Sequence, residues 1–333
     1  MAEYISSFIT GFDSVIGAAM KKSLPGARIL RVYDGLVYYS YNGNVQNINH
    51  ISFLNNSYLV YKVYKGNSLS FDKMVSQASI SADHGKKTGA FRVRFSKENQ
   101  FVKVGKQTAL AAEKLISGKT DMRVDRVNPQ NEYWFIIRRE NIGFFGKLLR
   151  KRKTTEKALH KGELRPEFAL LLCVFAEIKQ NEVLCDPFAG YGAIPIQAIQ
   201  SYRIAKMYVS DNDKNLVNRL KSMDVFQRCA RRVSIKCEDA MRLESVKDHE
   251  ISLVITDPPW GYYENIPDIQ EFYNTMFRSF KRILKAEGRA VVLSARKNEV
   301  ITAVKNENGY IVKQINTLIN GNKGGVFMIQ FLK

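Results

Sequence analysis

The chain has 333 residues and a strongly basic composition, with 51 Lys and Arg against 32 Asp and Glu, a net charge of +19. This length allows two or three domains, each with its own core. No apolar run approaches the ~18 residues of a membrane span, and residues 1–4 lack the basic-then-apolar plan of a signal peptide. We therefore expect a cytoplasmic protein with no membrane segment and a polyanionic partner.

Metal binding is not expected from the cysteine and histidine pattern. The four cysteines show no CxxC pairing and fall in predicted strands or helices, and the chain has only four histidines. We predict reduced core cysteines and no metal site. Separately from this pattern, a monomer is expected.

The N-terminal part is predicted to be a small α+β domain over residues 1–66. A strand over residues 2–9 precedes a helix over 12–22, and Leu24-Pro25-Gly26 ends that helix. Asp34-Gly35 is a two-residue hairpin turn between strands 28–33 and 36–41. A short helix near 45–53 and a strand over 58–64 complete a βαββαβ order, which is ferredoxin-like.

The second predicted domain covers residues 67–148. Its expected elements are helix 71–80, strand 91–96, helix 107–116, strand 122–127 and strand 133–138. A basic segment then begins at Lys147, and we assign residues 149–163 to a basic linker.

Positive charge is concentrated around this second domain. Residues 86–165 hold 21 Lys or Arg and 8 Asp or Glu, a balance of +13, with aromatic residues interleaved. A solvated basic face is the alternative interpretation, but the concentration of charge favours a nucleic-acid surface. The predicted RNA-binding residues are Arg92, Arg94, Lys147, Arg150, Lys151, Arg152 and Lys153.

From residue 164 the pattern alternates between helices and strands. The expected order is helix 166–178, strand 183–186, helix 193–201, strand 205–210, helix 213–230, strand 232–236, strand 251–256, helix 269–286, strand 289–294, helix 298–308, and strands 310–316 and 326–332. This order predicts a doubly wound parallel sheet over residues 164–333. The short final connection makes the last strand antiparallel.

Acidic or glycine-rich sequences follow four of these strands, and after the third this sequence is Glu238-Asp239, where an adenine amino group would lie. Asp186-Pro187-Phe188-Ala189-Gly190-Tyr191-Gly192 follows the first, and its glycines let the backbone approach a ligand closely. Asp211 ends the next strand and suits a ribose hydroxyl, whereas we interpret Asp213 as a helix N-cap. Asp186 would repel a pyrophosphate, which disfavours a dinucleotide, and it would favour a cationic amino acid.

The fourth strand ends in Asp257-Pro258-Pro259-Trp260. Two consecutive prolines hold the chain rigid and extended. The Asp257 carboxylate and the Pro258 carbonyl can then accept hydrogen bonds from an amino group on an aromatic ring, on which Trp260 can stack. A proline-stiffened turn is the alternative interpretation of the tetrapeptide alone.

Taken together, these features resemble the Rossmann-fold S-adenosylmethionine-dependent methyltransferases. Asp-Pro-Pro-Trp is similar to the motif of amino-group methyltransferases. Thr10-Gly11-Phe12, Leu24-Pro25-Gly26-Ala27, His160 and Leu164-Arg165-Pro166 resemble THUMP-containing RNA methyltransferases with a ferredoxin-like N-terminal domain. This chain differs from that family in having Trp260 where Tyr or Phe is usual, and Tyr191 where serine is frequent.

The resemblance implies a site for each ligand. The catalytic residues would be Asp257, Pro258, Pro259 and Trp260. The S-adenosyl-L-methionine site would include Arg165, Pro166, Asp186, Pro187, Phe188, Ala189, Gly190, Gly192, Asp211, Asn212, Glu238, Asp239, Ala240 and Asp257.

The activity implied is methylation of an exocyclic amino group, with guanosine N2 in the tRNA acceptor stem as the leading target. Adenine N6 or ribosomal RNA guanine N2 is the runner-up. A non-catalytic RNA-binding protein is a further alternative, whereas a protein or small-molecule methyltransferase would not need the basic N-terminal half.

Overall fold

The computed structural model describes residues 1–80, 89–151, 159–160, 162–262, 266–319 and 321–332, in two compact units. Unit 1 comprises Met1–Phe8 and Ile16–Lys153, and unit 2 comprises Ile9–Val15 and Thr154–Lys333. No helix within these described ranges is long and apolar enough to cross a membrane.

In the described part of unit 1, nine strands form one sheet in the order β2-β3-β1-β4-β9-β8-β5-β6, with β7 paired to β5. The strands are β1 (Ala2–Ser7), β2 (Arg28–Tyr33), β3 (Leu36–Tyr41), β4 (Ser57–Lys65), β5 (Ala90–Lys97), β6 (Gln100–Phe101), β7 (Arg123–Val124), β8 (Asn131–Arg138) and β9 (Ile142–Arg150). The helices are α1 (Asp13–Ser23), α2 (Gln46–Asn49), α3 (Phe71–Ser76) and α4 (Lys106–Ser117). The predicted βαββαβ order of residues 1–66 is present.

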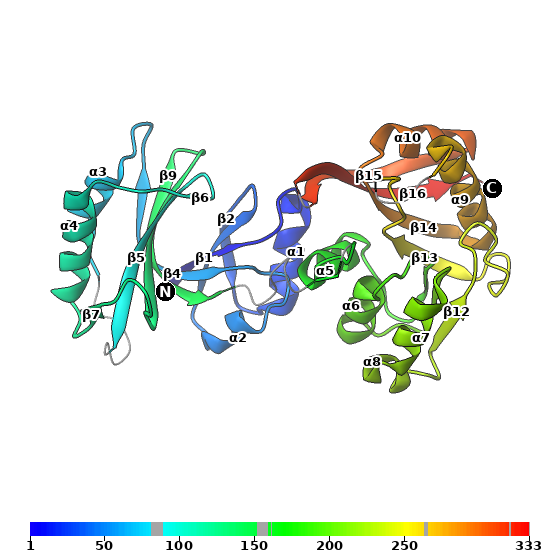
Figure 1. Cartoon of the computed structure of the whole chain (residues 1–333), viewed down its shortest axis with the longest axis horizontal. Coiled ribbons are helices and arrows are strands. Elements are labelled where there is room, and N and C mark those ends of the chain that lie inside the picture. Colours follow the sequence, from blue (N-terminus) through cyan, green and yellow to red (C-terminus); the bar gives the residue numbers. More distant parts are fainter. Residues whose placement is uncertain (81–88, 152–158, 161, 263–265, 320, 333) are drawn as a thin grey trace. The chain divides into compact units, whose positions relative to one another are not determined.

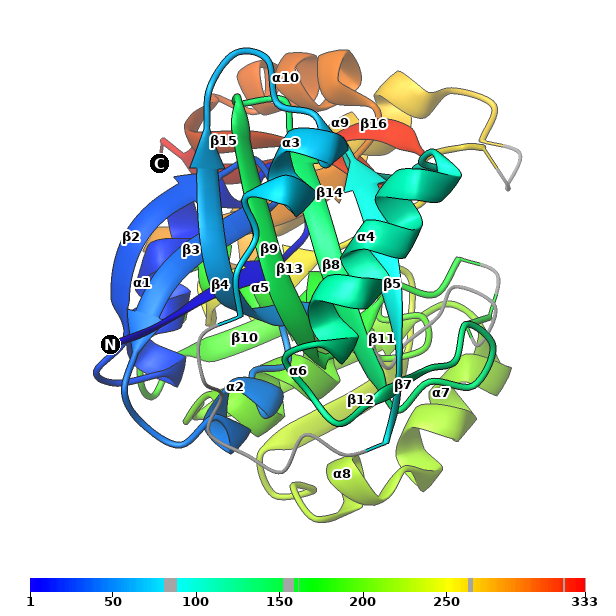
Figure 2. The same ribbon diagram turned by 90° about the vertical axis from the view of Figure 1, so that its left-hand side faces the viewer.

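One face of this sheet is covered by α3 and α4 (Figure 2). Phe91, Phe135 and Phe145 from the sheet pack with Met74 of α3 and Ile116 of α4 in one buried cluster. Because aromatic side chains alternate along these strands, the same strands also contribute to a second cluster that includes Phe144. The sheet therefore has apolar packing on both faces.

Strand β9 is the main departure from the elements expected in unit 1. It pairs with both β4 and β8, so Arg150, assigned above to the basic linker, belongs with Lys147 to a central strand. Gly146 explains why the strand was missed, since glycine lowers strand propensity. A Cβ at Gly146 would lie 2.3 Å from the Leu59 carbonyl oxygen, so glycine permits the close approach of β4.

Unit 2 contains the doubly wound sheet expected from the sequence, in the order β12-β11-β10-β13-β14-β16-β15. The strands are β10 (Val183–Asp186), β11 (Lys206–Asp211), β12 (Val233–Cys237), β13 (Ile251–Thr256), β14 (Leu284–Ser294), β15 (Gly309–Ile319) and β16 (Asn322–Phe331). The first five strands of this order, from β12 to β14, are parallel to one another, and β16 is antiparallel to both β14 and β15, as predicted.

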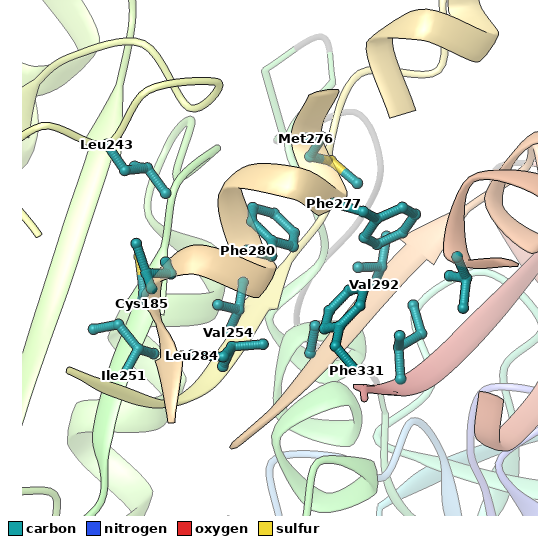
Figure 3. Close-up of a cluster of buried hydrophobic side chains, with 14 of the residues drawn as sticks. Cys185, Leu243, Ile251, Val254, Met276, Phe277, Phe280, Leu284, Val292 and Phe331 are labelled. Carbon is teal, nitrogen blue, oxygen red and sulfur yellow. The ribbon is translucent and has the colours of Figure 1, made fainter. Parts of the chain in front are cut away.

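Helices lie on both sides of this sheet (Figure 1). They are α5 (Pro166–Phe175), α6 (Ala193–Ser201), α7 (Lys214–Ser222), α8 (Asp224–Gln227), α9 (Ile269–Ile283) and α10 (Lys297–Asn306). Phe277 and Phe280 of α9 pack against Val254 and Val292 of the sheet (Figure 3). This packing holds the ends of β13 and β14 in place.

A short N-terminal segment is part of unit 2. The Thr317 hydroxyl donates a hydrogen bond of 2.8 Å to the Thr10 carbonyl. Gly11 has φ +90°, and a Cβ there would lie 1.9 Å from the Asn316 carbonyl oxygen, so only glycine fits. Phe12 is fully buried and meets Phe168 edge to face at 5.4 Å between ring centroids.

Four predicted helices of unit 2 end earlier than expected, and two of them, α5 and α10, do so by only two or three residues, at Phe175 and Asn306. The helix predicted over 213–230 is divided into α7 and α8, because Met223 between them is extended (φ −76°, ψ 130°). The helix predicted over 269–286 ends at Ile283, where Leu284 turns into the extended backbone of β14.

The four cysteines are free thiols. Cys173 and Cys185 are buried, as expected, whereas Cys229 is only partly buried and Cys237 is exposed, so these two are not core residues.

Candidate active site

The pocket of unit 2 lies where the strand order of its sheet reverses. β11 and β12 lie on one side of β10, and β13 and β14 lie on the other, so the carboxyl ends of β10 and β13 open into a crevice. A pocket of about 630 Å³ occupies this position. Its wall includes the predicted residues Asp186, Pro187, Phe188, Ala189, Gly190, Asp211, Asn212, Asp239, Ala240, Asp257, Pro258, Pro259 and Trp260.

Asp186 is the deepest carboxylate of the wall, with 1% of its surface exposed. Its Oδ1 accepts hydrogen bonds from the Thr256 hydroxyl at 2.6 Å and from the Phe188 amide at 3.3 Å. Burial raises the pKa of Asp186 to about 7, although the bond from Thr256 opposes this shift. A cation in the pocket would favour the ionised form.

The Asp257–Trp260 tetrapeptide follows β13 and crosses the wall beside Asp186. The Trp260 indole N–H donates to Asp257 Oδ1 at 3.1 Å, and the Trp260 carbonyl accepts from Arg296 Nε at 2.8 Å. Burial, and then the charge of Asp186, raise the pKa of Asp257 to about 8. Trp260 and Asp257 are thus fixed relative to each other.

Asp211 connects the end of β11 to the glycine loop. Its Oδ2 accepts from the Gly190 amide at 2.8 Å, and its Oδ1 accepts from the Asp213 amide at 3.0 Å. A Cβ at Gly190 would meet no protein atom within 4 Å, so the space beside the loop is open to a ligand. Asp213 caps α7 by accepting from the Asn215 amide, as predicted, and it also lines the pocket.

Four of the residues predicted to bind the cofactor lie outside the pocket wall. Gly192 has φ +86° and packs on α7, where a Cβ would lie 2.6 Å from a Leu220 methyl group. The Glu238 carboxylate accepts hydrogen bonds from the amide and hydroxyl of Ser245. Arg165 and Pro166 form the start of α5, and Gly162 to Leu164 just before them line the pocket instead.

The wall also contains residues that the sequence analysis did not assign to the site. They are Gly162, Glu163, Leu164, Tyr191, Ala193, Ile194, Asp213, Leu216, Met241, Gly261, Ile266, Phe272, Ile319 and Asn322. Tyr191 could have been predicted from its place in the glycine loop. Ile319 and Asn322 come from the β15–β16 hairpin, and no local motif marks them.

Some of the predicted RNA-binding residues are engaged within unit 1. Arg92 forms an ion pair of 2.6 Å with Glu132, and both side chains are largely buried. The Arg94 guanidinium lies over the Phe101 ring at 5.3 Å. Lys151 is exposed at the end of β9. Arg152 and Lys153 lie outside the described residues, and the RNA-binding role of this set stays a prediction.

Among the residues that the structure describes, no group of three or more His, Cys, Asp or Glu could hold a metal ion. The carboxylates of the pocket are instead bonded to backbone amides, a hydroxyl and an indole N–H.

Comparison with protein families decides the class of this site. The model of the UPF0020 family, described as "RMKL-like, methyltransferase domain", matches residues 152–326. The chain belongs to this methyltransferase family. The matched range includes the entire pocket wall described above.

Two curated relatives of this methyltransferase come from archaea. One, from Methanothermococcus thermolithotrophicus, is named a probable tRNA (guanine(10)-N2)-dimethyltransferase and is 30% identical over 140 residues, 39% of this chain and 81% of the relative. The other, from Methanocaldococcus jannaschii, is named a tRNA (guanine(10)-N2)-dimethyltransferase and is 25% identical over 221 residues. That alignment spans 61% of this chain and 62% of the relative, less than two thirds of its length.

The fold of the whole chain matches a solved structure. TrmN from Thermus thermophilus superposes with a TM-score of 0.79 and 17% sequence identity, over 100% of both chains. This likeness confirms the predicted fold class.

Proposed function

We propose that the protein is an S-adenosyl-L-methionine-dependent RNA methyltransferase that modifies guanosine N2 in tRNA. One observation carries this proposal. The acceptors of Asp257-Pro258 and the indole of Trp260 lie on the wall of the same pocket as the Gly190 loop and Asp211. A site for an aromatic amine and a site for a nucleoside cofactor therefore adjoin.

The residues of the pocket fit this cofactor. Asp211 is placed at a strand end, where a carboxylate suits ribose hydroxyls. Asp239 lies just after β12 and suits the adenine amino group. Asp186 favours a positive charge. When bound, S-adenosylmethionine supplies a methyl group on a sulfonium, which needs no covalent nucleophile from the protein.

The chain would act on the target by positioning and desolvation. Asp257 Oδ1 accepts from Trp260, and we expect Oδ2 and the Pro258 carbonyl to accept from the amino group of the base. These bonds would turn the nitrogen lone pair toward the methyl donor, and Trp260 would stack on the base. A paired target must be flipped out, at a cost of a few kcal/mol that this stacking partly offsets.

The choice of tRNA rests on the relatives and on charge. Both archaeal relatives are named for guanine N2 in tRNA, and the net charge of +19 suits a polyanionic substrate. The sequence analysis favours the acceptor stem, whereas both relatives are named for position 10, so mapping must cover both regions. We expect a monomer to suffice.

The direct test uses S-adenosylmethionine with a deuterated methyl group, the purified protein and unmodified total tRNA. Nucleoside mass spectrometry should find the label in N2-methylguanosine or its dimethylated form. Label in N6-methyladenosine would overturn the choice of base, and absence of label in both tRNA and ribosomal RNA would favour the non-catalytic alternative. Calorimetry with S-adenosylhomocysteine separates that alternative, because a protein without a cofactor site would bind none.

Substitution of Asp257 tests the site itself. Asp257→Ala should abolish turnover and leave S-adenosylhomocysteine binding nearly unchanged, because the carboxylate is assigned to the base. Asp248→Ala is the matched control, since this carboxylate is exposed and pairs with Arg282 away from the pocket. Activity of Asp257→Ala within about tenfold of wild type, a ~1.4 kcal/mol effect, would refute the assignment.

A further inference from the structure

Tyr191, His160 and Arg219 form a side-chain cluster that the proposed mechanism does not use. The His160 ring stacks on Tyr191 with 4.4 Å between centroids and 5° between planes. The Arg219 guanidinium lies 5.0 Å from the centroid of the same ring. Arg219 also contacts His160, with 3.1 Å between a guanidinium nitrogen and Nε2, and since arginine can only donate, Nε2 accepts. The three side chains form one group, the Tyr191 cluster.

This cluster adjoins a pocket whose wall is acidic. Within the described part of the chain, the wall contains no Lys, Arg or His. It contains the carboxylates of Glu163, Asp186, Asp211, Asp213, Asp239 and Asp257. A polyanion that brings one nucleotide into this pocket therefore needs cations at the rim to hold its phosphates. Tyr191 is a wall residue that holds one such cation, the exposed guanidinium of Arg219, against its ring.

Arg219 belongs to a basic stretch of unit 2. Residues 214–232 hold six Lys or Arg and one acidic residue, Asp224. All six basic side chains are exposed, on or just after α7 and α8: Lys214, Arg219, Lys221, Arg228, Arg231 and Arg232. Arg228 pairs with Asp224 at 3.6 Å, whereas no ion pair to Arg219 occurs within the described ranges. The charge of Arg219 is therefore available to an external anion.

The anion could be a phosphodiester of the RNA or the carboxylate of the cofactor. Exposure favours the phosphodiester, because His160 and Arg219 are both exposed while a cofactor carboxylate would be enclosed with the rest of that ligand. The planar guanidinium, already held against a ring, is suited to bidentate binding of phosphate.

We propose that the Tyr191 cluster binds a backbone phosphate of the RNA substrate next to the target nucleotide, and that the basic surface of α7 and α8 continues this contact. Unit 2 thus holds RNA by its own surface, at the mouth of the pocket. The inference rests on the proposed function, of which it specifies the substrate contact.

The experiment measures binding of unmodified tRNA to the full chain by fluorescence anisotropy at several salt concentrations. Arg219→Ala should weaken binding roughly 10-fold, the effect of one charge-assisted hydrogen bond. It should also reduce the slope of log affinity against log salt by about 1. Lys305→Ala is the matched control and should change neither quantity, because Lys305 is an exposed lysine of α10, beside β15 and away from α7 (Figure 1).

Two further variants test the geometry. Arg219→Lys should recover the salt slope but only part of the affinity, since lysine keeps the charge and loses the planar fork. Tyr191→Ser should weaken RNA binding by removing the ring against which Arg219 and His160 are held. S-adenosylhomocysteine affinity, measured by calorimetry without RNA, should be unchanged in Arg219→Ala.

The outcomes separate this inference from the proposed function. Equal tRNA affinity and salt slope in wild type, Arg219→Ala and Lys305→Ala would overturn the inference alone. Loss of S-adenosylhomocysteine affinity in Arg219→Ala, with tRNA affinity kept, would assign the cluster to the cofactor carboxylate and also overturn it. Absence of RNA binding by the wild-type protein would overturn the proposed function and this inference with it.

Discussion

In the proposed mechanism, the chemistry of the pocket depends on two neighbouring carboxyl groups, Asp186 and Asp257. Burial raises the pKa of both groups, the charge of Asp186 raises the pKa of Asp257 further, and the charge of Asp211 does the same for Asp186. The hydrogen bonds from Thr256 and Trp260 act in the opposite direction, since they stabilise the carboxylates. A bound cation or an N–H donor would therefore lower the pKa of these two groups and favour their ionised form, which accepts hydrogen bonds.

Trp260 has a role that Tyr or Phe at this position could not supply, because its indole N–H donates to Asp257. We predict that Trp260→Phe keeps the stacking surface but raises the pKa of Asp257. The ionised carboxylate is the acceptor, so the rising limb of the pH–rate profile should move to higher pH. Single-turnover methylation of tRNA over pH 6 to 10 measures this, with Tyr262→Phe as the control. A limb that does not move would show that the N–H is not needed.

The raised pKa of Asp257 also predicts how stability changes with pH. Its folded value of about 8 lies above the ordinary 3.8, so the folded state favours the protonated form. This stabilisation is complete below about pH 4 and is lost as the pH rises through 8. Asp257→Asn should therefore melt several degrees above wild type at pH 9 and close to it at pH 4. Thermal unfolding across this range, with Asp248→Asn as control, checks the prediction, and parallel curves would contradict it.

At the scale of single elements, β9 shows how neighbouring strands override local propensity. Its residues include two glycines and two basic residues, yet it lies between β4 and β8. Gly146 is needed for close packing, since a Cβ there would lie 2.3 Å from the Leu59 carbonyl, whereas a Cβ at Gly143 would meet the flexible end of the Met74 side chain at 2.9 Å.

We predict that Gly146→Ala destabilises unit 1 by roughly 1–3 kcal/mol, because the added methyl group meets rigid backbone of β4. Gly17→Ala is the matched control: it lies within α1, where a Cβ meets no atom within 4 Å, and it should stabilise by about 0.5–1 kcal/mol. In a Trp260→Phe background the fluorescence of Trp134 reports unit 1 during urea unfolding. Equal midpoints for the two alanine variants would refute the argument.

At the scale of the whole molecule, the chain is not divided in sequence order. Ile9–Val15 belongs to unit 2, while the residues before and after it belong to unit 1. Gly11 lies against the backbone of Asn316 in β15, and the Phe12 ring packs on Phe168 of α5. Unit 2 therefore needs the N-terminus in order to complete its core.

Phe12→Ala should accordingly destabilise unit 2 by roughly 3–5 kcal/mol, the usual cost of removing a buried ring. In a Trp134→Phe background, Trp260 reports unit 2, and S-adenosylhomocysteine binding gives a second readout. Phe101→Ala is the control, because Phe101 is 69% exposed in unit 1. Unchanged unfolding of the Trp260 signal in Phe12→Ala would show that the segment is dispensable.

The sequence alone determined the elements that carry strong local signals. β2, β3, β10, α6 and β13 begin and end at the predicted residues. Alternation, hairpin glycines and apolar runs depend on near neighbours in the chain, and so they can be read without a structure. The same holds for the Gly190 loop, Asp211, Asp239 and the Asp257–Trp260 tetrapeptide, because strand ends of a parallel sheet meet at one edge.

Only the tertiary structure decided the features that depend on residues far apart in sequence. Three features depend on such distant residues. They are the insertion of β9 between β4 and β8, the place of Ile9–Val15 in unit 2, and the contact of Arg296 with Trp260. The turning of Glu238 toward Ser245 and away from the pocket is likewise decided by the tertiary structure. The physical reason is that hydrogen-bonding partners and packing neighbours are chosen by the folded backbone, whereas residue type only limits which partners a position can accept.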